Sequence, residues 1–384
     1  MLDLARQEIA ATARTVLIKV GTRVLTRDDG SLDGERIARL AGEVAGVVES
    51  GRRALLVSSG AVGAGVSRLG LPGRPRDLAK LQAVAAVGQT HLIETYERTF
   101  RDHGLHAAQV LLTADDLDNR QRYLNVRNTL LALLDAGVVP IINENDTIAV
   151  DELATTFGDN DRLAAMVTNL LRAPLMIILS DVEGLFDRDP SDPAAAVVAT
   201  VARIDDAVLD LARARPSSHG MSKGGMASKL AAARMVTAAG ENVVIASGKR
   251  SGVISAILRG ETVGTLFLAE GKSMSPWKRW IGYSARPAGT ITLDAGACAA
   301  IAAHGRSLLP IGIAGVTGAF QKGDVVSLAN ASGREIARGL TNYGAADVLK
   351  IMGRKTEQIR ELLGYHPYDE VVHRDNLIVT AAGH

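Results

Sequence analysis

A lysine lies inside the first strongly apolar stretch of the chain. Residues 15–25 read T-V-L-I-K-V-G-T-R-V-L, which predicts a buried strand that carries Lys19, breaks at Gly21 and continues as a loop containing Thr22. An ammonium group among β-branched residues is costly to bury unless a carboxylate or another anion meets it at the strand end. One interpretation is that this anion is a phosphate. The other is a lysine whose head reaches solvent at a sheet edge.

Two turns rich in small residues offer places for phosphate oxygens. G-A-V-G-A-G covers residues 60–65, and S-K-G-G-M-A-S-K covers residues 222–229. Glycine lets backbone amides approach phosphate oxygens closely, and a helix expected around Leu230 to Ala239 would add the dipole of its N-terminus. The second turn also carries Lys223 and Lys229. Its alternative reading is a flexible linker before a helix.

A carboxylate that could hold such lysines follows at residues 158–161, G-D-N-D, directly before an apolar helix expected at 163–171. Asp159 or Asn160 alone could be the N-cap of that helix. Three polar side chains in succession exceed what a cap requires. A carboxylate such as Asp161 is suited to hold two lysine ammonium groups at fixed positions.

Motifs and composition exclude several function classes. The chain has no G-x-x-x-x-G-K-[ST] motif, and Arg68 stands where a dinucleotide fingerprint needs glycine, which argues against a P-loop protein or a Rossmann dehydrogenase. Cys298 is the single cysteine, so neither an intrachain disulfide framework nor a multi-cysteine zinc site is available. The net charge of +1 gives no support for a polybasic protein. We expect a soluble, cytoplasmic protein, because no apolar run approaches the ~18 residues that span a bilayer.

The elements that must position these residues alternate between strands and helices. We expect strands near 16–20, 54–57, 107–112, 138–142 and 175–179, and helices near 34–50, 78–101, 120–135, 162–172 and 230–239. This alternation predicts an α/β fold with a doubly wound, mostly parallel sheet. Ligands in such sheets bind beyond the carboxyl ends of the strands. With 384 residues, the chain is also longer than one hydrophobic core usually serves, so we expect two domains.

Polar residues or glycines follow four of the expected strands. They are Lys19 and Gly21; Ser58, Ser59 and Gly60; Asn143, Glu144, Asn145 and Asp146; and Ser180 and Asp181. Each group alone is also ordinary turn chemistry. Together they converge on one edge of a parallel sheet and mark it as the candidate ligand site.

Seven motifs, in this order along the chain, resemble the glutamate 5-kinase family of the amino-acid-kinase superfamily. They are K-V-G-T (19–22), V-S-S-G-A-V-G-A-G (57–65), L-Q-A-V-A-A-V-G-Q (81–89), V-V-P-I-I-N-E-N-D (138–146), F-G-D-N-D (157–161), L-S-D-V-E-G-L-F (179–186) and G-G-M-A-S-K (224–229). The tail is similar to the PUA domain and terminus of the long bacterial form, in S-L-L-P-I-G-I (307–313), G-D-V-V (323–326) and V-V-H-R-D-N-L (371–377). The resemblance implies a catalytic domain over 1–268 with an amino-acid-kinase-like sandwich, a connection over 269–288, and a small β-barrel-like PUA domain with the C-terminal tail over 289–384.

The resemblance also implies an activity and roles by position. The activity is ATP-dependent phosphorylation of the γ-carboxylate of L-glutamate to L-glutamyl 5-phosphate, the first step of proline biosynthesis, with Mg²⁺. Catalytic roles fall to Lys19 and Lys229, which would contact the phosphates, and to Asp161, which would orient both. Glutamate would be held by Ser59, Gly60, Asp146 and Asn160. The nucleotide would be held by Lys19, Gly21, Ser180, Asp181, Lys223, Gly224, Gly225, Met226, Ala227, Ser228 and Lys229.

One position departs from the family pattern. Ser222 and Lys223 stand where the family commonly has Gly-Thr or Gly-Ser, so this chain carries an additional cation beside the expected nucleotide contacts.

The implied chemistry suits these residue types. A carboxylate acceptor with a reference pKa near ~4.3 is already ionised at neutral pH, so no general base is needed. The obstacle is the approach of an anion to a polyanion, which positioning and charge neutralisation by lysines, amides and Mg²⁺ overcome. Phosphates and water would hold most of the Mg²⁺ coordination sphere, so no protein metal ligand is predicted.

The tail leaves alternatives open. PUA domains often bind RNA, yet the region has few aromatic residues for base stacking, so we favour a structural or regulatory module. The alternative function for the whole chain is an RNA-associated protein whose α/β half binds a nucleotide. The family resemblance further implies a homo-oligomer, feedback inhibition by proline at the glutamate site, and no membrane association.

Overall fold

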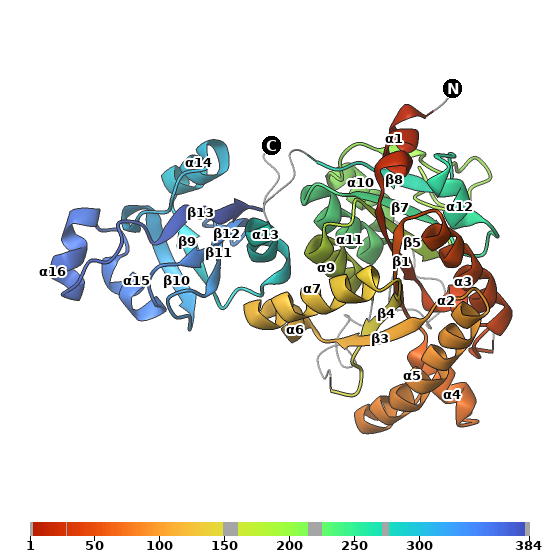
Figure 1. Ribbon diagram of the computed structural model, residues 1–384. Helices are drawn as coiled ribbons and strands as arrows, with labels where there is room; N and C mark the ends of the chain where they lie inside the picture. Colours follow the sequence, from red (N-terminus) through yellow and green to blue (C-terminus); the bar gives the residue numbers. More distant parts are fainter. Residues whose placement is uncertain (1–2, 28, 149–159, 214–224, 271–275, 381–384) are drawn as a thin grey trace. The chain divides into compact units, whose positions relative to one another are not determined.

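The computed structural model describes residues 3–27, 29–148, 160–213, 225–270 and 276–380 (Figure 1). The chain divides into two compact units. The first comprises Met1–Leu117 and Gln121–Ser273, and the second comprises Asp118–Arg120 and Met274–His384. Each unit has its own hydrophobic core.

The first unit is built on an eight-stranded sheet with the strand order β3-β4-β2-β1-β5-β7-β8-β6. Its strands are β1 (Thr15–Val20), β2 (Arg53–Ser58), β3 (Ala107–Leu112), β4 (Val139–Glu144), β5 (Leu175–Ser180), β6 (Thr200–Val201), β7 (Asn242–Ser247) and β8 (Thr265–Phe267). In this order, the neighbouring pairs β3–β4, β4–β2, β2–β1, β1–β5 and β5–β7 are all parallel, and β8 runs antiparallel to β7. The predicted α/β fold with a mostly parallel sheet is therefore confirmed.

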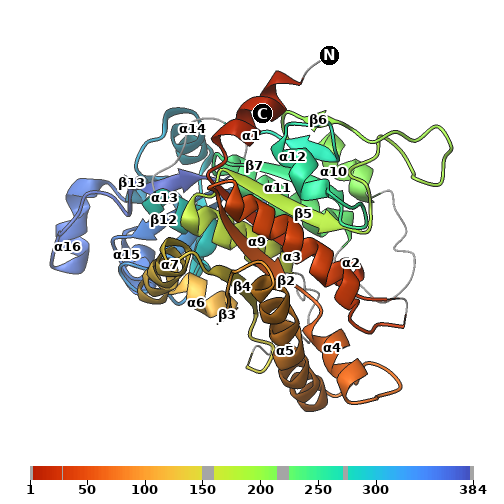
Figure 2. The ribbon, with the colours of Figure 1, turned by 45° about the vertical axis from the view of Figure 1, so that its right-hand side comes forward.

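Helices cover both faces of this sheet (Figures 1 and 2). They are α1 (Leu4–Thr12), α2 (Thr22–Leu25), α3 (Gly34–Glu49), α4 (Ala61–Arg68), α5 (Leu78–Arg101), α6 (Ala114–Asp118), α7 (Arg120–Asp135), α9 (Asn160–Leu171), α10 (Asp206–Arg213), α11 (Met226–Ala238) and α12 (Val253–Leu258). Helices α3 and α12 lie on one face of the central strands, and α9 and α11 lie on the other (Figure 2).

The alternation of side chains along β1 explains how the two faces differ. Val16, Ile18 and Val20 are buried in one core cluster with Ile37 and Leu40 of α3. Because successive residues of a strand point to opposite faces, Lys19 points to the side on which α9 and α11 lie. The strand therefore presents an apolar surface to one layer and a single ammonium group to the other.

Two glycines allow α4 and α5 to pack with their backbones in close contact. A Cβ atom on Gly65 would lie 1.9 Å from the carbonyl oxygen of Val84, and one on Gly88 would lie 1.7 Å from that of Ala61. No larger residue fits at either position unless the helices separate. The contact fixes α4, which begins directly after the end of β2.

The structure corrects two local expectations. Thr22, expected in a loop, begins the short helix α2. The helix expected from Leu230 begins earlier, at Met226, so Lys229 lies in the first turn of α11 and not in a preceding turn. The physical reason is that the first turn of α11 carries small and charged side chains, which show no apolar periodicity, while Lys229 is anchored by a contact with α9.

The second unit contains a five-stranded sheet in the order β10-β9-β11-β12-β13. Its elements are α13 (Pro276–Arg279), the π-helix η1 (Trp280–Ser284), β9 (Gly289–Leu293), α14 (Ala295–His304), the 3₁₀ helix η2 (Pro310–Gly312), β10 (Ile313–Gly318), β11 (Val325–Ala329), β12 (Glu335–Thr341), α15 (Ala345–Ile351), the 3₁₀ helix η3 (Thr356–Gln358), α16 (Ile359–Leu363) and β13 (Val372–Val379). In the segment before β9, the rings of Trp277 and Trp280 stack with centroids 5.5 Å apart.

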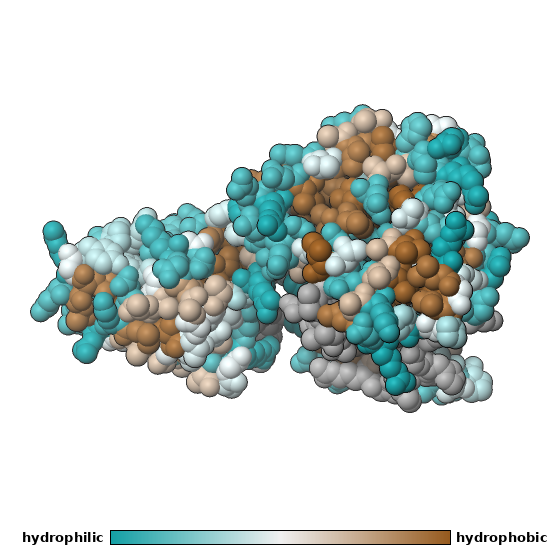
Figure 3. Space-filling model, turned by 90° about the horizontal axis from the view of Figure 1, so that it is seen from below, coloured by the Kyte–Doolittle hydropathy of each residue, from teal (hydrophilic) through white to brown (hydrophobic). Residues whose placement is uncertain are grey.

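The surface of both units is mixed in character. On the face shown in Figure 3, apolar patches are small and are separated by hydrophilic residues. In the described part of the chain, no helix combines the length and the apolar composition needed to cross a lipid bilayer.

Candidate active site

A buried cluster of three charged side chains lies beside the carboxyl ends of the central strands. The Nζ atom of Lys19 lies 2.5 Å from Oδ1 of Asp161, and the Nζ atom of Lys229 lies 3.3 Å from Oδ2 of the same carboxylate. The hydroxyl of Ser228 also donates to Oδ2, at 2.9 Å. Exposed fractions are 2% for Lys19, 0% for Asp161 and 6% for Lys229.

Three different elements bring these residues together. Lys19 comes from β1, Asp161 from the first turn of α9, and Lys229 from the first turn of α11. The first turn of a helix favours a carboxylate, because the positive end of the helix dipole stabilises it. The packing of α9 against α11 on one face of the sheet then places both ammonium groups on one aspartate.

The charge of the cluster points to an anionic ligand. Two lysine ammonium groups lie against one carboxylate, in a place with little access to water. Positive groups held close together in such a place attract an anion more strongly than they would in water. The contact of Lys19 with a phosphate stays a prediction.

On the β4 side of this cluster, amide and hydroxyl groups form a network. The Nδ2 group of Asn160 donates to the backbone carbonyl of Ser58 at 2.8 Å, to Oδ1 of Asn143 at 2.9 Å and to Oγ of Ser59 at 3.2 Å. We call Ser58, Ser59, Asn143, Asp146 and Asn160 the β2–β4 half of the site. Its hydrogen bonds join the ends of β2 and β4 to the start of α9.

Asn143 has a role that the sequence analysis did not assign. Its side chain is buried, and its Oδ1 atom accepts from Asn160 and from the backbone of Glu144. Its Nδ2 group has no hydrogen-bond partner among the residues that the structure describes. A buried amide group without a partner is costly, so this donor is suited to a ligand oxygen. The signal in the sequence was its place directly after an apolar run.

A buried tyrosine contacts this network through its hydroxyl group. Tyr96 of α5 is fully buried, and its hydroxyl lies 3.1 Å from the hydroxyl of Ser58. Burial raises the pKa of Tyr96 to about 12, although the hydrogen bond with Ser58 acts in the opposite direction. Tyr96 therefore stays a neutral hydroxyl at physiological pH and can donate to or accept from Ser58.

Asp146 is the titratable member of the β2–β4 half. Burial raises the pKa of Asp146 to about 6, while the positive charge of Arg74 acts to lower it. The carboxylate is thus poorly compensated by the protein itself. A cationic group on a ligand would stabilise its charged form.

On the other side of Lys19, the residues after β5 form a second group. Ser180 is buried, and its hydroxyl donates to Oδ1 of Asp181 at 3.1 Å. Oδ2 of Asp181 accepts from a guanidinium nitrogen of Arg23 at 2.8 Å. Burial acts to raise the pKa of Asp181, but the hydrogen bond and charge of Arg23, together with hydrogen bonds from the backbone amide of Asp181 and from Ser180, outweigh it, so the pKa is lowered. We call Arg23, Ser180 and Asp181 the β5 half of the site.

The strand order places these groups in a row. Strands β4, β2, β1 and β5 are consecutive neighbours in the sheet. The β2–β4 half therefore lies on one side of Lys19, and the β5 half lies on the other. A ligand bound by each half would meet the other at the lysines.

Comparison with known proteins agrees with this geometry. The model of the amino acid kinase family matches residues 14–247, and the model of the PUA domain matches residues 289–363. Glutamate 5-kinase of Rhodopirellula baltica is 48% identical over 378 residues, covering 98% of this chain and 97% of its own length. Glutamate 5-kinase of Moorella thermoacetica is 50% identical over 368 residues, covering 96% of each chain. The chain belongs to the glutamate 5-kinase branch of the amino acid kinase family.

Three glycines among the predicted site residues lie at the ends of strands or the starts of helices. The backbone amide of Gly21 donates to the carbonyl of Leu179 at 3.0 Å, and a Cβ on Gly21 would approach Nζ of Lys19 to 4.0 Å. Gly60 has φ of 104°, which favours glycine, and it is the N-cap of α4. Gly225 is the N-cap of α11.

The first turn of α11 holds the remaining predicted nucleotide contacts. Met226 is buried, whereas Ala227 is exposed. Lys223 and Gly224 lie outside the described residues, and so does the departure from the family pattern at Ser222. The sequence analysis did not predict the contribution of Arg23, whose partner lies 158 residues away in the sequence.

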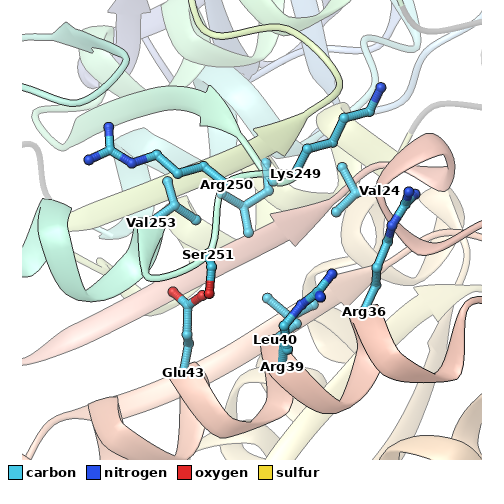
Figure 4. Close-up of a pocket in the computed structure, with 11 residues that line it drawn as sticks. Val24, Arg36, Arg39, Leu40, Glu43, Lys249, Arg250, Ser251 and Val253 are labelled. Atoms are coloured by element: carbon cyan, nitrogen blue, oxygen red, sulfur yellow. The ribbon is translucent and has the colours of Figure 1, made fainter.

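A hollow lies on the face of the sheet that α3 covers, and its lining includes no residue of the β2–β4 half or the β5 half. It is lined by Val24, Arg36, Arg39, Leu40, Glu43, Leu179, Gly248, Lys249, Arg250, Ser251 and Val253 (Figure 4). Both carboxylate oxygens of Glu43 accept from backbone amides, those of Gly252 and Ile254. The side chains of Lys249 and Arg250 point away from one another (Figure 4), so the cations of this hollow do not converge on one point.

Proposed function

We propose that this protein transfers the γ-phosphoryl group of ATP to the γ-carboxylate of L-glutamate and so forms L-glutamyl 5-phosphate, the first step of proline biosynthesis. The observation that carries the proposal is the buried cluster in which Asp161 holds both Lys19 and Lys229. The cluster lies between the β2–β4 half and the β5 half, which would bind the two substrates. The relatives named glutamate 5-kinase, similar over nearly the whole chain, support the same substrate.

The two lysines would neutralise the reacting phosphates. The transferred phosphoryl group carries negative charge on its three equatorial oxygens, which repels the incoming carboxylate, and fixed ammonium groups reduce that repulsion without reorganisation at the moment of reaction. Asp161 would act as a positioning group, because its two oxygens each hold one lysine. No proton has to be removed from the acceptor, so no general base is assigned.

The β2–β4 half would hold glutamate. Asp146 would bind the substrate ammonium group, because its carboxylate lacks full compensation within the protein. Ser59, Gly60 and Asn160 would orient the substrate at the edge of the sheet, and the free Nδ2 donor of Asn143 faces the same network.

The β5 half and the start of α11 would hold ATP. Ser180 ends β5 and Asp181 follows it, Gly21 follows β1, and Gly225 to Lys229 form the N-terminus of α11, whose amides and dipole favour phosphate. We keep Lys223 and Gly224 in the nucleotide site as part of the same proposal.

A magnesium ion fits this donor set as a companion of the nucleotide. Among the described residues, no group of three or more His, Cys, Asp or Glu side chains is arranged to hold a metal ion. Mg²⁺ is commonly held by substrate phosphates and water. When bound, it would reduce the negative charge of the phosphates, and the role of this chain would be to position those phosphates through Lys19, Lys229 and the start of α11.

The direct test is product capture. The purified protein would be incubated with ATP, Mg²⁺, L-glutamate and hydroxylamine, which converts an acyl phosphate into a stable hydroxamate. We expect hydroxamate with L-glutamate and little with L-aspartate, whose side chain is one methylene shorter. Absence of γ-glutamyl hydroxamate under conditions where ATP binds would refute the proposal.

The remaining proposals concern the surroundings of the reaction. We propose a cytoplasmic homo-oligomer inhibited by proline at the glutamate site, with the division into residues 1–268, 269–288 and 289–384 stated above. We further propose that the PUA domain has a structural or regulatory role. Light scattering tests the oligomeric state. Inhibition kinetics test whether proline competes with glutamate. Retention of RNA on filters at different salt concentrations tests the role of the PUA domain.

A further inference from the structure

An ion pair joins the ends of two neighbouring strands in the nucleotide part of the site. Arg23 lies in α2, directly after β1, and its guanidinium nitrogen lies 2.8 Å from Oδ2 of Asp181, directly after β5. The side chains are 37% and 26% exposed, respectively, so both remain within reach of a ligand.

The surrounding contacts give the Asp181 carboxylate one orientation. Ser180 donates to its Oδ1 atom while Arg23 donates to its Oδ2 atom. The backbone beneath is fixed as well, because the amides of Gly21 and Gly248 donate to the carbonyls of Leu179 and Ser180, respectively. Asp181 therefore presents its remaining lone pairs in a constant direction.

The register of the sheet places this carboxylate beyond the reacting phosphates. Lys19 pairs with Ile178 in the parallel ladder. Asp181 follows Ile178 by three residues, about 10 Å between Cα positions along an extended strand. The Nζ atom of Lys19 reaches part of that way, to 4.0 Å from a Cβ on Gly21. With Lys19 at the phosphate that is transferred, Asp181 lies on the next strand away from the β2–β4 half. The rest of the nucleotide would lie on this side, where ribose hydroxyls are donors that a carboxylate accepts.

An unpaired carboxylate at this place would oppose nucleotide binding. It would repel the polyphosphate, and it would be free to rotate away from the ribose. The guanidinium of Arg23 removes both obstacles, because it offsets the charge and holds one oxygen. A half-exposed ion pair contributes little to folding, so stability alone is a weak reason for this arrangement.

We propose that Arg23 is a positioning residue of the nucleotide site, which orients the Asp181 carboxylate toward the nucleoside and cancels its charge beside the polyphosphate. The inference rests on the proposed function, since it takes ATP as the nucleotide. It adds a residue that has no role in the sequence motifs and acts through Asp181.

The experiment measures nucleotide affinity without turnover. Isothermal titration calorimetry with Mg²⁺ and the β,γ-imido analogue of ATP gives the Kd for the full chain and its variants. We expect Arg23→Gln to raise this Kd about fivefold, and Arg23→Lys, which keeps the charge, to raise it at most about twofold. Arg39→Gln is the matched control, because it removes an exposed arginine of α3 that belongs to neither half of the site, and its Kd should equal that of the wild type.

A double-mutant cycle tests whether Arg23 acts through Asp181. In an Asp181→Asn background, the effect of Arg23→Gln on Kd should shrink below about twofold, because the charge that Arg23 compensates is gone. In the hydroxamate assay, the KM for ATP should rise in Arg23→Gln, while kcat and the KM for glutamate stay within about twofold.

Several results would overturn the inference. They are an unchanged Kd in Arg23→Gln, an equal change in Arg39→Gln, or a full effect of Arg23→Gln in the Asp181→Asn background. Failure of the proposed function is separable from these, because the wild type would then bind the analogue and yet form no γ-glutamyl hydroxamate.

Discussion

The two halves of the site use different physical means on either side of Lys19. The β2–β4 half consists of a network of amides and hydroxyls, with Asn143 and Asn160 largely closed to solvent. The β5 half consists of a half-exposed ion pair between Arg23 and Asp181. A buried network is intolerant of loss, since each missing partner leaves a desolvated polar group, whereas an exposed pair can be weakened by degrees. Glutamate recognition should therefore fail sharply and nucleotide recognition gradually.

Removal of Lys19 or Lys229, which lie between the two halves of the site, should produce the largest loss of activity. This loss should not distinguish the β2–β4 half from the β5 half. We expect Lys19→Met or Lys229→Met to lower kcat about a thousandfold, with the KM for glutamate changed at most about threefold, because charge neutralisation acts mainly on the transition state. Steady-state kinetics of hydroxamate formation checks this. Lys249→Met, an exposed lysine after β7, is the matched control.

The lysine variants should keep their stability. Loss of one lysine leaves a neutral pair of one ammonium and one carboxylate, whereas Asp161→Asn leaves two buried ammonium groups together. Thermal unfolding should therefore show a lower Tm for Asp161→Asn and a wild-type or higher Tm for Lys229→Met. Near-normal turnover in either lysine variant would contradict the assigned role.

The next largest effect should be a loss of glutamate binding, which concerns the β2–β4 half alone. Asp146→Asn should raise the KM for glutamate about thirtyfold, because the substrate ammonium loses its charged partner, while the Kd for the ATP analogue stays constant. The pH profile sharpens the test. With the pKa of Asp146 raised to about 6, its carboxyl becomes protonated as pH falls below 6, so kcat/KM for glutamate should decline there in the wild type.

Asp146→Asn should weaken glutamate binding, but it should stabilise the folded protein at high pH. Because the folded-state pKa of Asp146 is raised, the carboxyl contributes stability at low pH that is lost as pH rises through about 6. Asp146→Asn should therefore raise the Tm at pH 8 and leave it nearly unchanged at pH 4. A glutamate KM that does not move, or a profile of kcat/KM identical in both proteins, would remove Asp146 from the substrate site.

Packing beneath the β2–β4 half offers a smaller and more indirect perturbation. Gly88→Ala places a methyl group against the carbonyl of Ala61, so α4 and α5 must separate, which should lower the free energy of unfolding by about 2 kcal/mol. The displacement of α4 should raise the KM for glutamate more than that for ATP. Gly46→Ala in α3, where nothing lies within 4 Å, is the control and should stabilise the helix. Equal stability of the two variants would contradict the close contact.

The smallest effect is expected from Tyr96→Phe. The substitution keeps the buried ring and removes the hydroxyl that contacts Ser58. The KM for glutamate should rise about threefold with no change in ATP affinity, because only the support of the network is weakened. A change in ATP affinity of the same size would mean that the two halves are not separable.

Much of this arrangement could be predicted from the sequence, because it depends on strongly periodic segments. The bounds of α5, α7 and β3 agree with the expected ranges, since each has clear apolar spacing. Lys19 and Asp161 were marked because a lysine in a buried strand requires an anion, and because three polar side chains in succession before a helix exceed what an N-cap needs.

The remainder depends on tertiary contacts that no local pattern records. The first turn of α11 carries small side chains, so its start at Met226 becomes visible only through the contact of Lys229 with Asp161. The edge strand β10, with two glycines and little alternation, was missed. The pairing of Arg23 with Asp181 joins residues far apart in the sequence, and both also suit an ordinary solvated surface.

The most direct measurement is a crystal structure of the protein with Mg²⁺, the β,γ-imido analogue of ATP and glutamate. The account predicts that the Nζ atoms of Lys19 and Lys229 both lie about 3 Å from phosphate oxygens, with Asp161 still between them and glutamate on the β2–β4 side. A triphosphate bound elsewhere, or lysine nitrogens that face separate cavities, would contradict it.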